Sequence, residues 1–523
     1  MKRNRREFLE DVSSGMLIAG LGAGLAGDLG ISTAAAGEED LELNFGELDS
    51  LVGQMQDTPP EKLQPILIKQ YQEGTVDLRQ LIAAAALANA ETFGGQDYVG
   101  FHTEMALLPA LQMTADLPKD RAALPVFKVL YRNTQRIQDS GLSKTKTLKK
   151  VKPAELPAGT DEGPLLLEAS RAADMERGER VFAAAMQKSP KHAYNQLLWA
   201  VQDNSNVHRF ALAHRAWKLI DVVGVEHAHT LLRQCIRFCV HQEPGIQQYV
   251  KRRNLTVEPM RAAITRIVDQ YRLLDRRAGT LKADDAWLEN MSAYIFSHTD
   301  EESMDAVAAA LQEGFAPESV AQAISLAANH LVLRQDRFTE DSWRSHGATP
   351  GVHASDAANA WRNMIGVSTP RNVMVGLLVS AWNCGGSKSF SSYDPLPHAE
   401  DLGKLKSTSQ EALLAEAEDA IRQNDQKRAA AAIGLYGQKG HATRPAMDLM
   451  LKYAISEDGR LHSEKYYRTV TEEYALTNPA FRWRQVTALA RVTASAYGYS
   501  VDDQKGFRAA GYDEACRLLN VEV

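Results

Sequence analysis

Residues 78–88 read Leu78-Arg-Gln-Leu-Ile-Ala-Ala-Ala-Ala-Leu-Ala88, and this alanine- and leucine-rich stretch decides the fold class. Alanine and leucine are among the strongest helix formers, because they lose little side-chain freedom in a helix. Apolar residues recur here at three- and four-residue spacing, which is the period of a helix that packs against other helices. The stretch therefore predicts a buried helix.

The same pattern extends over most of the chain after residue 60. Sustained alternation of apolar and polar residues, which is typical of a half-buried strand, is nearly absent. We therefore predict an all-α fold with no substantial sheet, an array of αα-hairpins arranged as a solenoid or as a closed α/α toroid. The other predicted helices cover residues 103–116, 121–138, 165–188, 209–221, 225–241, 257–275, 303–314, 317–334, 354–366, 371–382, 409–422, 427–436, 442–455, 462–475 and 480–497.

Capping residues support the start of two helices. Asp57-Thr58-Pro59-Pro60 and Thr299-Asp300-Glu301-Glu302 both place side-chain acceptors or proline where a helix begins. Such residues satisfy or remove the backbone N–H groups that have no partner in the first helical turn. Both segments predict helix N-termini.

Three irregular stretches divide the array. Residues 141–164 combine lysine, proline and glycine, residues 338–352 are polar and broken, and residues 384–407 contain Cys-Gly-Gly-Ser and a Tyr-Asp-Pro-Leu-Pro turn. Long loops are uncommon in helical arrays and are often functional. The predicted organisation is a signal at 1–36, N-terminal hairpins at 37–140, a linker at 141–164, a central array at 165–383, a loop at 384–407 and C-terminal hairpins at 408–523.

The N-terminus has the features of a twin-arginine export signal. Arg5-Arg6-Glu7-Phe8-Leu9 follows a basic start, a short glycine-rich apolar run comes next, and Ala34-Ala35-Ala36 offers a cleavage site. The apolar run is too short to span a bilayer, so membrane association would be peripheral tethering at most. We expect the twin-arginine translocation machinery as a partner and a periplasmic or cell-surface location. This route carries folded proteins, many of which already hold a cofactor.

Composition excludes several other classes of protein. The formal net charge is −7, with 59 basic and 66 acidic residues, so there is no electrostatic footprint for nucleic acid. Four cysteines in 523 residues do not make a disulfide scaffold, and no CxxC or CxxCH motif occurs. Small buried apolar residues are the better interpretation of these cysteines.

A recurrent histidine is the most specific feature of the sequence. Gln96-Asp97 precedes His102 and Gln202-Asp203 precedes His208, each as Gln-Asp-x4-His between one predicted helix and the next. A third Gln-Asp pair, at Asp336, is separated by an insertion from His353, which also starts a helix. A weaker copy ends in His441, where the aspartate is missing, and a degenerate fifth lies at residues 226–229.

Two interpretations of this recurrence stay open. In the structural one, Asp97 and Asp203 cap the following helices, and each histidine bonds its own local loop. In the functional one, equivalent hairpin positions bring His102, His208 and His353 to one cavity, with His441 as a further member. Asp97, Asp203 and Asp336 would then lie behind or beside the imidazoles, which could ligate iron, copper or zinc.

One segment also resembles a known family. Residues 352–364, Val-His-Ala-Ser-Asp-Ala-Ala-Asn-Ala-Trp-Arg-Asn-Met, are similar to the histidine-anchored helix of questin-oxidase-like helical proteins. The wider layout resembles exported bacterial helical-repeat proteins of the same type, with most force between His208 and His353. The resemblance implies an all-helical fold and an oxidative chemistry such as oxygen insertion next to a ketone. Among the family's catalytic residues, it implies a counterpart in this sequence only for His353.

These observations favour a metal- or cofactor-assisted oxidoreductase that acts on a small organic molecule. Two alternatives are a non-catalytic helical-repeat scaffold that binds a peptide, glycan or protein, and a metal or haem carrier. Metal analysis and an absorption spectrum of the exported protein discriminate among the three.

Overall fold

The computed structural model describes residues 41–522 apart from positions 143, 145 and 276 and the segments 336–348, 386–393 and 499–507. The predicted export signal lies outside these residues. Within them the prediction of an all-α fold is confirmed: helices follow one another without a strand, and one isolated β-bridge joins Leu281 to Phe315. In the same residues, no helix combines the length and apolar character that crossing a lipid bilayer requires.

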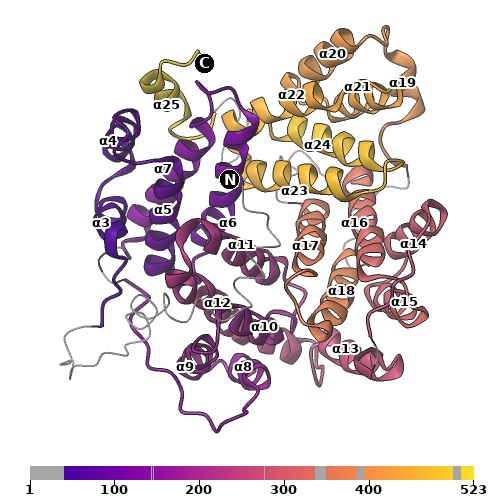
Figure 1. The fold of residues 1–523 in the computed structure, drawn as a ribbon. Helices are drawn as coiled ribbons and strands as arrows, with labels where there is room; N and C mark the ends of the chain where they lie inside the picture. The colour runs from indigo at the N-terminus through magenta and orange to yellow at the C-terminus, as the bar shows by residue number, and fades with distance from the viewer. Residues whose placement is uncertain are drawn as a thin grey trace.

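The first half of the chain forms one group of helices, on the left and at the bottom of Figure 1. A side-chain cap from Asp77 starts the alanine-rich helix α5, and Gly94 ends it in the left-handed region at φ 52°. The helices of this half are α3 (Asp49–Asp57), α4 (Pro60–Gln72), α5 (Leu78–Phe93), α6 (Tyr98–Met113), α7 (Leu124–Ser140), α8 (Glu162–Arg171), α9 (Met175–Met186), α10 (Pro190–Val201), α11 (Val207–Val223) and α12 (Ala228–Arg252).

The second half forms the other group, on the right of Figure 1. Thr299 and Glu302 form a reciprocal capping box at the start of α15, as the sequence predicted. The helices are α13 (Pro259–Gln270), α14 (Asp285–Ser297), α15 (Asp300–Glu313), α16 (Pro317–Arg334), α17 (Pro350–Met364), α18 (Pro370–Gly385), α19 (Ala399–Lys404), α20 (Gln410–Arg422), α21 (Gln426–Gln438), α22 (Thr443–Ser456), α23 (Ser463–Leu476) and α24 (Arg482–Ala496).

The structure differs from the sequence prediction in several places. Residues 165–188 form two helices, because Ala173 adopts a positive φ of 53° and Asp174 caps a new helix, α9. Helices α3, α10 and α14 and the helix at Tyr512–Leu519 were not among the predicted segments. The short helix α19 lies inside the stretch 384–407 that was expected to be loop, with two acidic residues in its first turn.

The first and last helices of the described part of the chain lie close together. The final helix, α25 (Tyr512–Leu519), packs against α4 and α7. Gln64 Nε2 donates to the carbonyl of Gly511 at 2.9 Å, and Gln72 Nε2 donates to the carbonyl of Leu518 at 3.1 Å. An open solenoid keeps contacts between neighbouring repeats only, so these contacts between first and last helices give a more closed arrangement.

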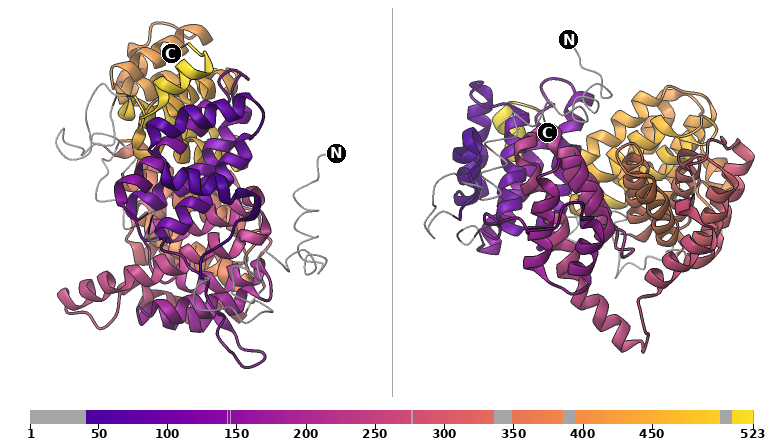
Figure 2. Two further views of the ribbon diagram at one scale, coloured as in Figure 1. Left: turned by 90° about the vertical axis from the view of Figure 1, so that its left-hand side faces the viewer. Right: turned by 60° about the horizontal axis from the view of Figure 1, so that its bottom comes forward.

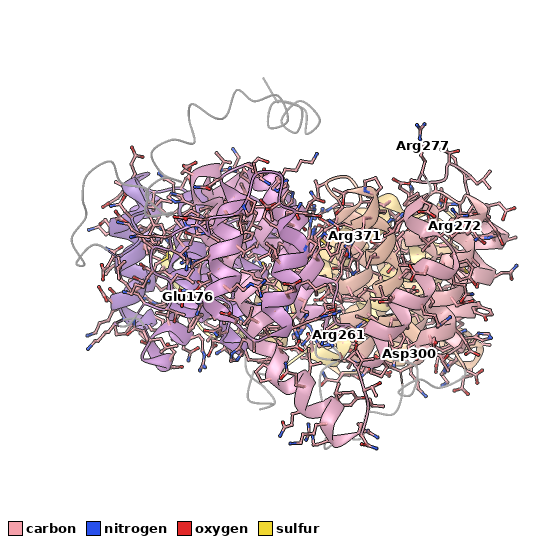
Figure 3. All side chains as sticks on the ribbon, turned by 90° about the horizontal axis from the view of Figure 1, so that it is seen from below. Glu176, Arg261, Arg272, Arg277, Asp300 and Arg371 are labelled. Atoms are coloured by element: carbon pink, nitrogen blue, oxygen red, sulfur yellow. The ribbon has the colours of Figure 1, made fainter. Side chains whose placement is uncertain are left out.

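One continuous hydrophobic core joins the two halves. It extends from Leu43 to Val521, and it includes contacts of α11 with α17 and of α6 with α23. Figure 2 shows the two groups side by side, with the C-terminal turns of α12 and the segment toward α13 projecting from the body. Arg371 of α18 lies where the groups meet in Figure 3, with its guanidinium 3.4 Å from the ring centroid of Trp199 in α10.

Candidate metal centre

Four histidines come together where the two halves meet, and each lies at the start of a helix. His102 is in the first turns of α6, His208 is the second residue of α11, and His353 is in the first turn of α17. His462 is the residue immediately before α23 and occupies its N-cap position. The contacts of α6 with α23 and of α11 with α17 bring these four helix starts together.

The ring nitrogens of these histidines lie within a few ångströms of one another. The Nε2 atoms of His102 and His208 are 3.1 Å apart, and those of His353 and His462 are 3.2 Å apart. One ring nitrogen each from His102, His208 and His353 lies within 4.8 Å of the other two. The ring centroids of His208 and His353 are 5.4 Å apart, and those of His102 and His462 are 5.3 Å apart.

The Nδ1 side of these rings is held by local oxygen atoms. His102 Nδ1 lies 2.6 Å from the backbone carbonyl of Tyr98, one turn earlier in α6. His208 Nδ1 lies 2.9 Å from Oδ1 of Asn206, which also accepts the backbone N–H of His208. The ring of His353 likewise hydrogen-bonds to the backbone of Thr349. A carbonyl oxygen can only accept, so the contacts of His102 and His208 assign the proton to Nδ1 of those two rings.

This tautomer leaves a lone pair on each Nε2. The Nε2 lone pairs of His102 and His208 then point toward each other across 3.1 Å with no proton between them. A cation that both nitrogens can share removes this repulsion. Nitrogen ligands lie about 2.0–2.1 Å from a zinc ion, so tetrahedral ligation places them about 3.3–3.4 Å apart, close to the 3.1 Å between His102 and His208.

The surroundings keep all four imidazoles neutral. Burial is the main cause, and the positive charge of Lys465 adds to it. Together they lower the pKa of His353 to about 4 and those of His102, His208 and His462 well below the usual value. Neutral imidazole is the form that ligates a metal, so these rings stay ready to bind without first losing a proton.

The centre is buried but not sealed. His102 and His462 are each 3% exposed, whereas His208 and His353 keep an intermediate exposure. Tyr98, 62% exposed, places its ring 4.4 Å from that of His102 and 5.8 Å from that of His208. The ring of Phe101 contacts the same two histidines. His102 and His208 therefore lie just below the surface, covered by the rings of Tyr98 and Phe101.

Two aspartates of the sequence motif, Asp97 and Asp203, have arginine partners. Asp97 caps α6 by accepting from the backbone N–H of Gly100 at 2.7 Å, and it forms an ion pair with Arg136. Asp203 does not cap α11, a role taken by Asn206, and instead binds Arg171 and Arg261. Both carboxylates bind nearby guanidinium groups. A charged guanidinium is a stronger partner for a carboxylate than a neutral imidazole is. Asp336 lies outside the described residues.

His441 also lies apart from the other histidines. Its Nε2 is 2.8 Å from the carbonyl of Thr408, and its ring packs on Tyr436. In its place the fourth histidine is His462, which the sequence motif did not include. A weak signal was available, because Glu457-Asp458 precedes His462 with three intervening residues, a shortened and altered copy of the motif.

A second group of potential ligands carries less weight. His398, Glu400 and Asp401 lie close together at the start of α19. Asp401 is bound by Lys404 at 2.9 Å, and Glu400 is exposed. Clusters of exposed carboxylates paired with lysine are ordinary surface features.

Comparisons with models of known protein families, with curated proteins and with solved structures found no match to this chain.

Proposed function

We propose that this protein is a metal-dependent enzyme in which His102, His208 and His353 bind one transition-metal ion. One observation carries the proposal: imidazole nitrogens from three separate helices lie within 4.8 Å of one another. Oxygen contacts on Nδ1 of His102 and His208 aim the Nε2 lone pairs at each other. Building four buried imidazoles into one core is costly unless something satisfies them.

The donor set selects the class of metal. Imidazole nitrogen suits zinc, copper, iron and nickel, whereas calcium and magnesium prefer oxygen ligands. We propose iron, copper or zinc. The oxidative chemistry that the resemblance of residues 352–364 implies requires iron or copper, since zinc has no redox chemistry.

Three protein ligands leave a coordination position for water or substrate. Catalytic metal sites usually keep such a position, whereas structural sites fill all four with protein ligands. The intermediate exposure of His208 and His353 fits a site that small molecules reach. A periplasmic enzyme that acts on a small organic molecule and is loaded with metal before export is the assignment these features support best.

A structural or carrier role is the second candidate, and one observation favours it. His102 and His208 belong to the first half of the chain, and His353 and His462 to the second. A metal that engaged all four would cross-link the halves and close its coordination sphere. In that case the ion would stabilise the fold without binding substrate.

Metal analysis of the full chain, purified through its export route, tests the proposal. We expect one iron, copper or zinc ion per chain, and its loss in a His208→Ala/His353→Ala variant. His441→Ala, which removes a histidine outside the centre, should keep the metal. A wild-type protein that is colourless and binds none of the three metals would overturn the proposal and favour a non-catalytic scaffold.

A second measurement separates the catalytic from the structural role. In the catalytic case, a small exogenous ligand changes the spectrum of the metal, and removal of the metal by a chelator lowers the melting temperature only modestly. In the structural case, the spectrum does not respond to the ligand, and chelation strongly destabilises the chain.

A further inference from the structure

Lys465 is a buried cation beside the four histidines. It lies in the first turn of α23, three residues after His462, and is only 5% exposed. Its charge acts on the pKa of each of the four imidazoles. The ammonium group therefore lies within the electrostatic range of the whole centre.

The charged groups that attract this ammonium group are carboxylates. Among the described residues, it makes no hydrogen bond and no ion pair. Asp356 and Glu464 are the carboxylates that attract it. Glu464 is bound by Lys128 at 2.6 Å, and Asp356 accepts a hydrogen bond from Thr469 Oγ1 at 2.8 Å. Asp356 therefore remains the carboxylate that balances Lys465 at longer range, and an anionic ligand at the centre would add the direct contact that Asp356 does not make.

The helix starts at the centre have the same electrostatic preference. Helices α6, α11, α17 and α23 all begin near it, because each carries one of the four histidines at or next to its N-terminal end. Each N-terminus carries a partial positive charge of roughly half an elementary charge. A divalent metal on three neutral imidazoles adds two positive charges, so an anion is needed to balance the site.

We propose that the open position of the metal and Lys465 together bind a small oxyanion, so that the substrate or a co-substrate carries a carboxylate or a similar anionic group. One oxygen would occupy the metal, and another would accept a hydrogen bond from Lys465 Nζ. This inference rests on the proposed metal centre and names the class of ligand that it takes. Lys465 is then a substrate-binding residue that selects anionic ligands over neutral ones.

Cobalt-loaded protein provides the test, because cobalt(II) reports its ligands through its visible absorption spectrum. Titration of wild-type protein with acetate, and separately with inorganic phosphate, should shift the spectrum in a saturable way. A preference for acetate identifies a carboxylate, and a preference for phosphate identifies a phosphate group. Lys465→Met should bind cobalt at the same stoichiometry and weaken anion binding by about 10- to 100-fold, as expected for a lost charge-assisted hydrogen bond.

Two further variants make the result decisive. Lys465→Arg keeps the charge and should keep anion affinity within about tenfold of wild type, so it tests the inference even if the methionine variant is unstable. Lys452→Met removes a half-exposed surface lysine and should change nothing.

The outcomes distinguish a failure of the metal centre from a failure of the role of Lys465. Failure of cobalt to bind contradicts the metal centre itself. Cobalt binding with an anion affinity that is equal in wild type and Lys465→Met, or with no response to either anion, contradicts the role of Lys465 alone.

Discussion

His102 and His208 are 106 residues apart in the chain, yet their Nε2 atoms lie 3.1 Å apart. Each ring binds a local oxygen on its Nδ1 side and faces the other on its Nε2 side. Each imidazole thus uses one nitrogen for a local hydrogen bond and the other for a contact with a residue distant in the chain. A histidine that only capped or bonded its own loop would have no reason to direct its second nitrogen at another histidine.

Replacement of a single metal ligand should abolish tight metal binding. We expect His208→Ala to weaken the affinity for zinc or copper by more than about 100-fold, because even loss of an outer contact to a ligand costs about 10- to 100-fold. Isothermal titration calorimetry measures the change. His441→Ala serves as the matched control, and an equal loss in both variants would show that the metal binds elsewhere.

His462 should have a smaller effect on the metal than His208. Its Nε2 contacts that of His353. It lies outside the group of three histidines whose ring nitrogens are all within 4.8 Å of one another. We expect His462→Ala to retain one metal ion per chain with an affinity reduced by about tenfold. Loss of binding as severe as in His208→Ala would instead make His462 a full ligand and the site a closed one. The cobalt spectrum distinguishes these results independently of affinity.

The buried ion pair between Lys128 and Glu464 should be important for stability. Their side chains are 1% and 0% exposed, and Lys128 also donates to the carbonyls of Ala454 and Glu457. Lys128→Met leaves the Glu464 charge buried and unpaired, so we expect a loss of about 3–5 kcal/mol in the free energy of unfolding. Urea denaturation measures this loss.

The double variant Lys128→Met/Glu464→Leu is the control for this pair. Because it removes both charges, it should be less destabilised than the sum of the two single variants. Strict additivity would show that the pair does not act as a unit.

Glu472 should make stability depend on pH in the acid range. Burial alone would raise the pKa of this carboxyl group, but the charges of Arg215, Lys218 and Arg468 outweigh it and hold the pKa well below its usual range. A lowered folded-state pKa contributes stability above the unfolded-state value, about 4.3, and this stability is lost as the pH falls further.

We therefore expect Glu472→Gln to destabilise the protein by about 3–5 kcal/mol at pH 7 and by progressively less below about pH 4. Urea unfolding at several pH values measures the difference from wild type. Glu301→Gln, at an exposed ion pair with Arg266, should cost no more than about 1 kcal/mol at any pH. A pH-independent effect of Glu472→Gln would contradict this account.

The candidate site was predictable from the sequence in part. The motif pointed to His102, His208 and His353, because each follows a turn and starts a helix, and the structure brings these three together. The motif pointed more weakly to His441, which lies apart, and it missed His462, whose preceding residues are Glu-Asp with a shorter spacing. Asp97 and Asp203 were expected behind or beside the imidazoles, and the structure shows that both bind arginine side chains from other helices.

The sequence by itself determined where the helices form and where most of them begin. Helix propensity, apolar spacing and caps such as Asp77, Asp97 and Thr299 act over a few residues, so they can be read without knowledge of the fold. Only the tertiary structure decided which helix starts meet, which arginine binds which aspartate, and that Lys465 is buried beside four histidines. The physical reason is that these contacts join different helices, with a separation along the chain of 39 residues from Asp97 to Arg136 and of 106 from His102 to His208. Their geometry depends on the packing of the whole core, which no local pattern in the sequence encodes.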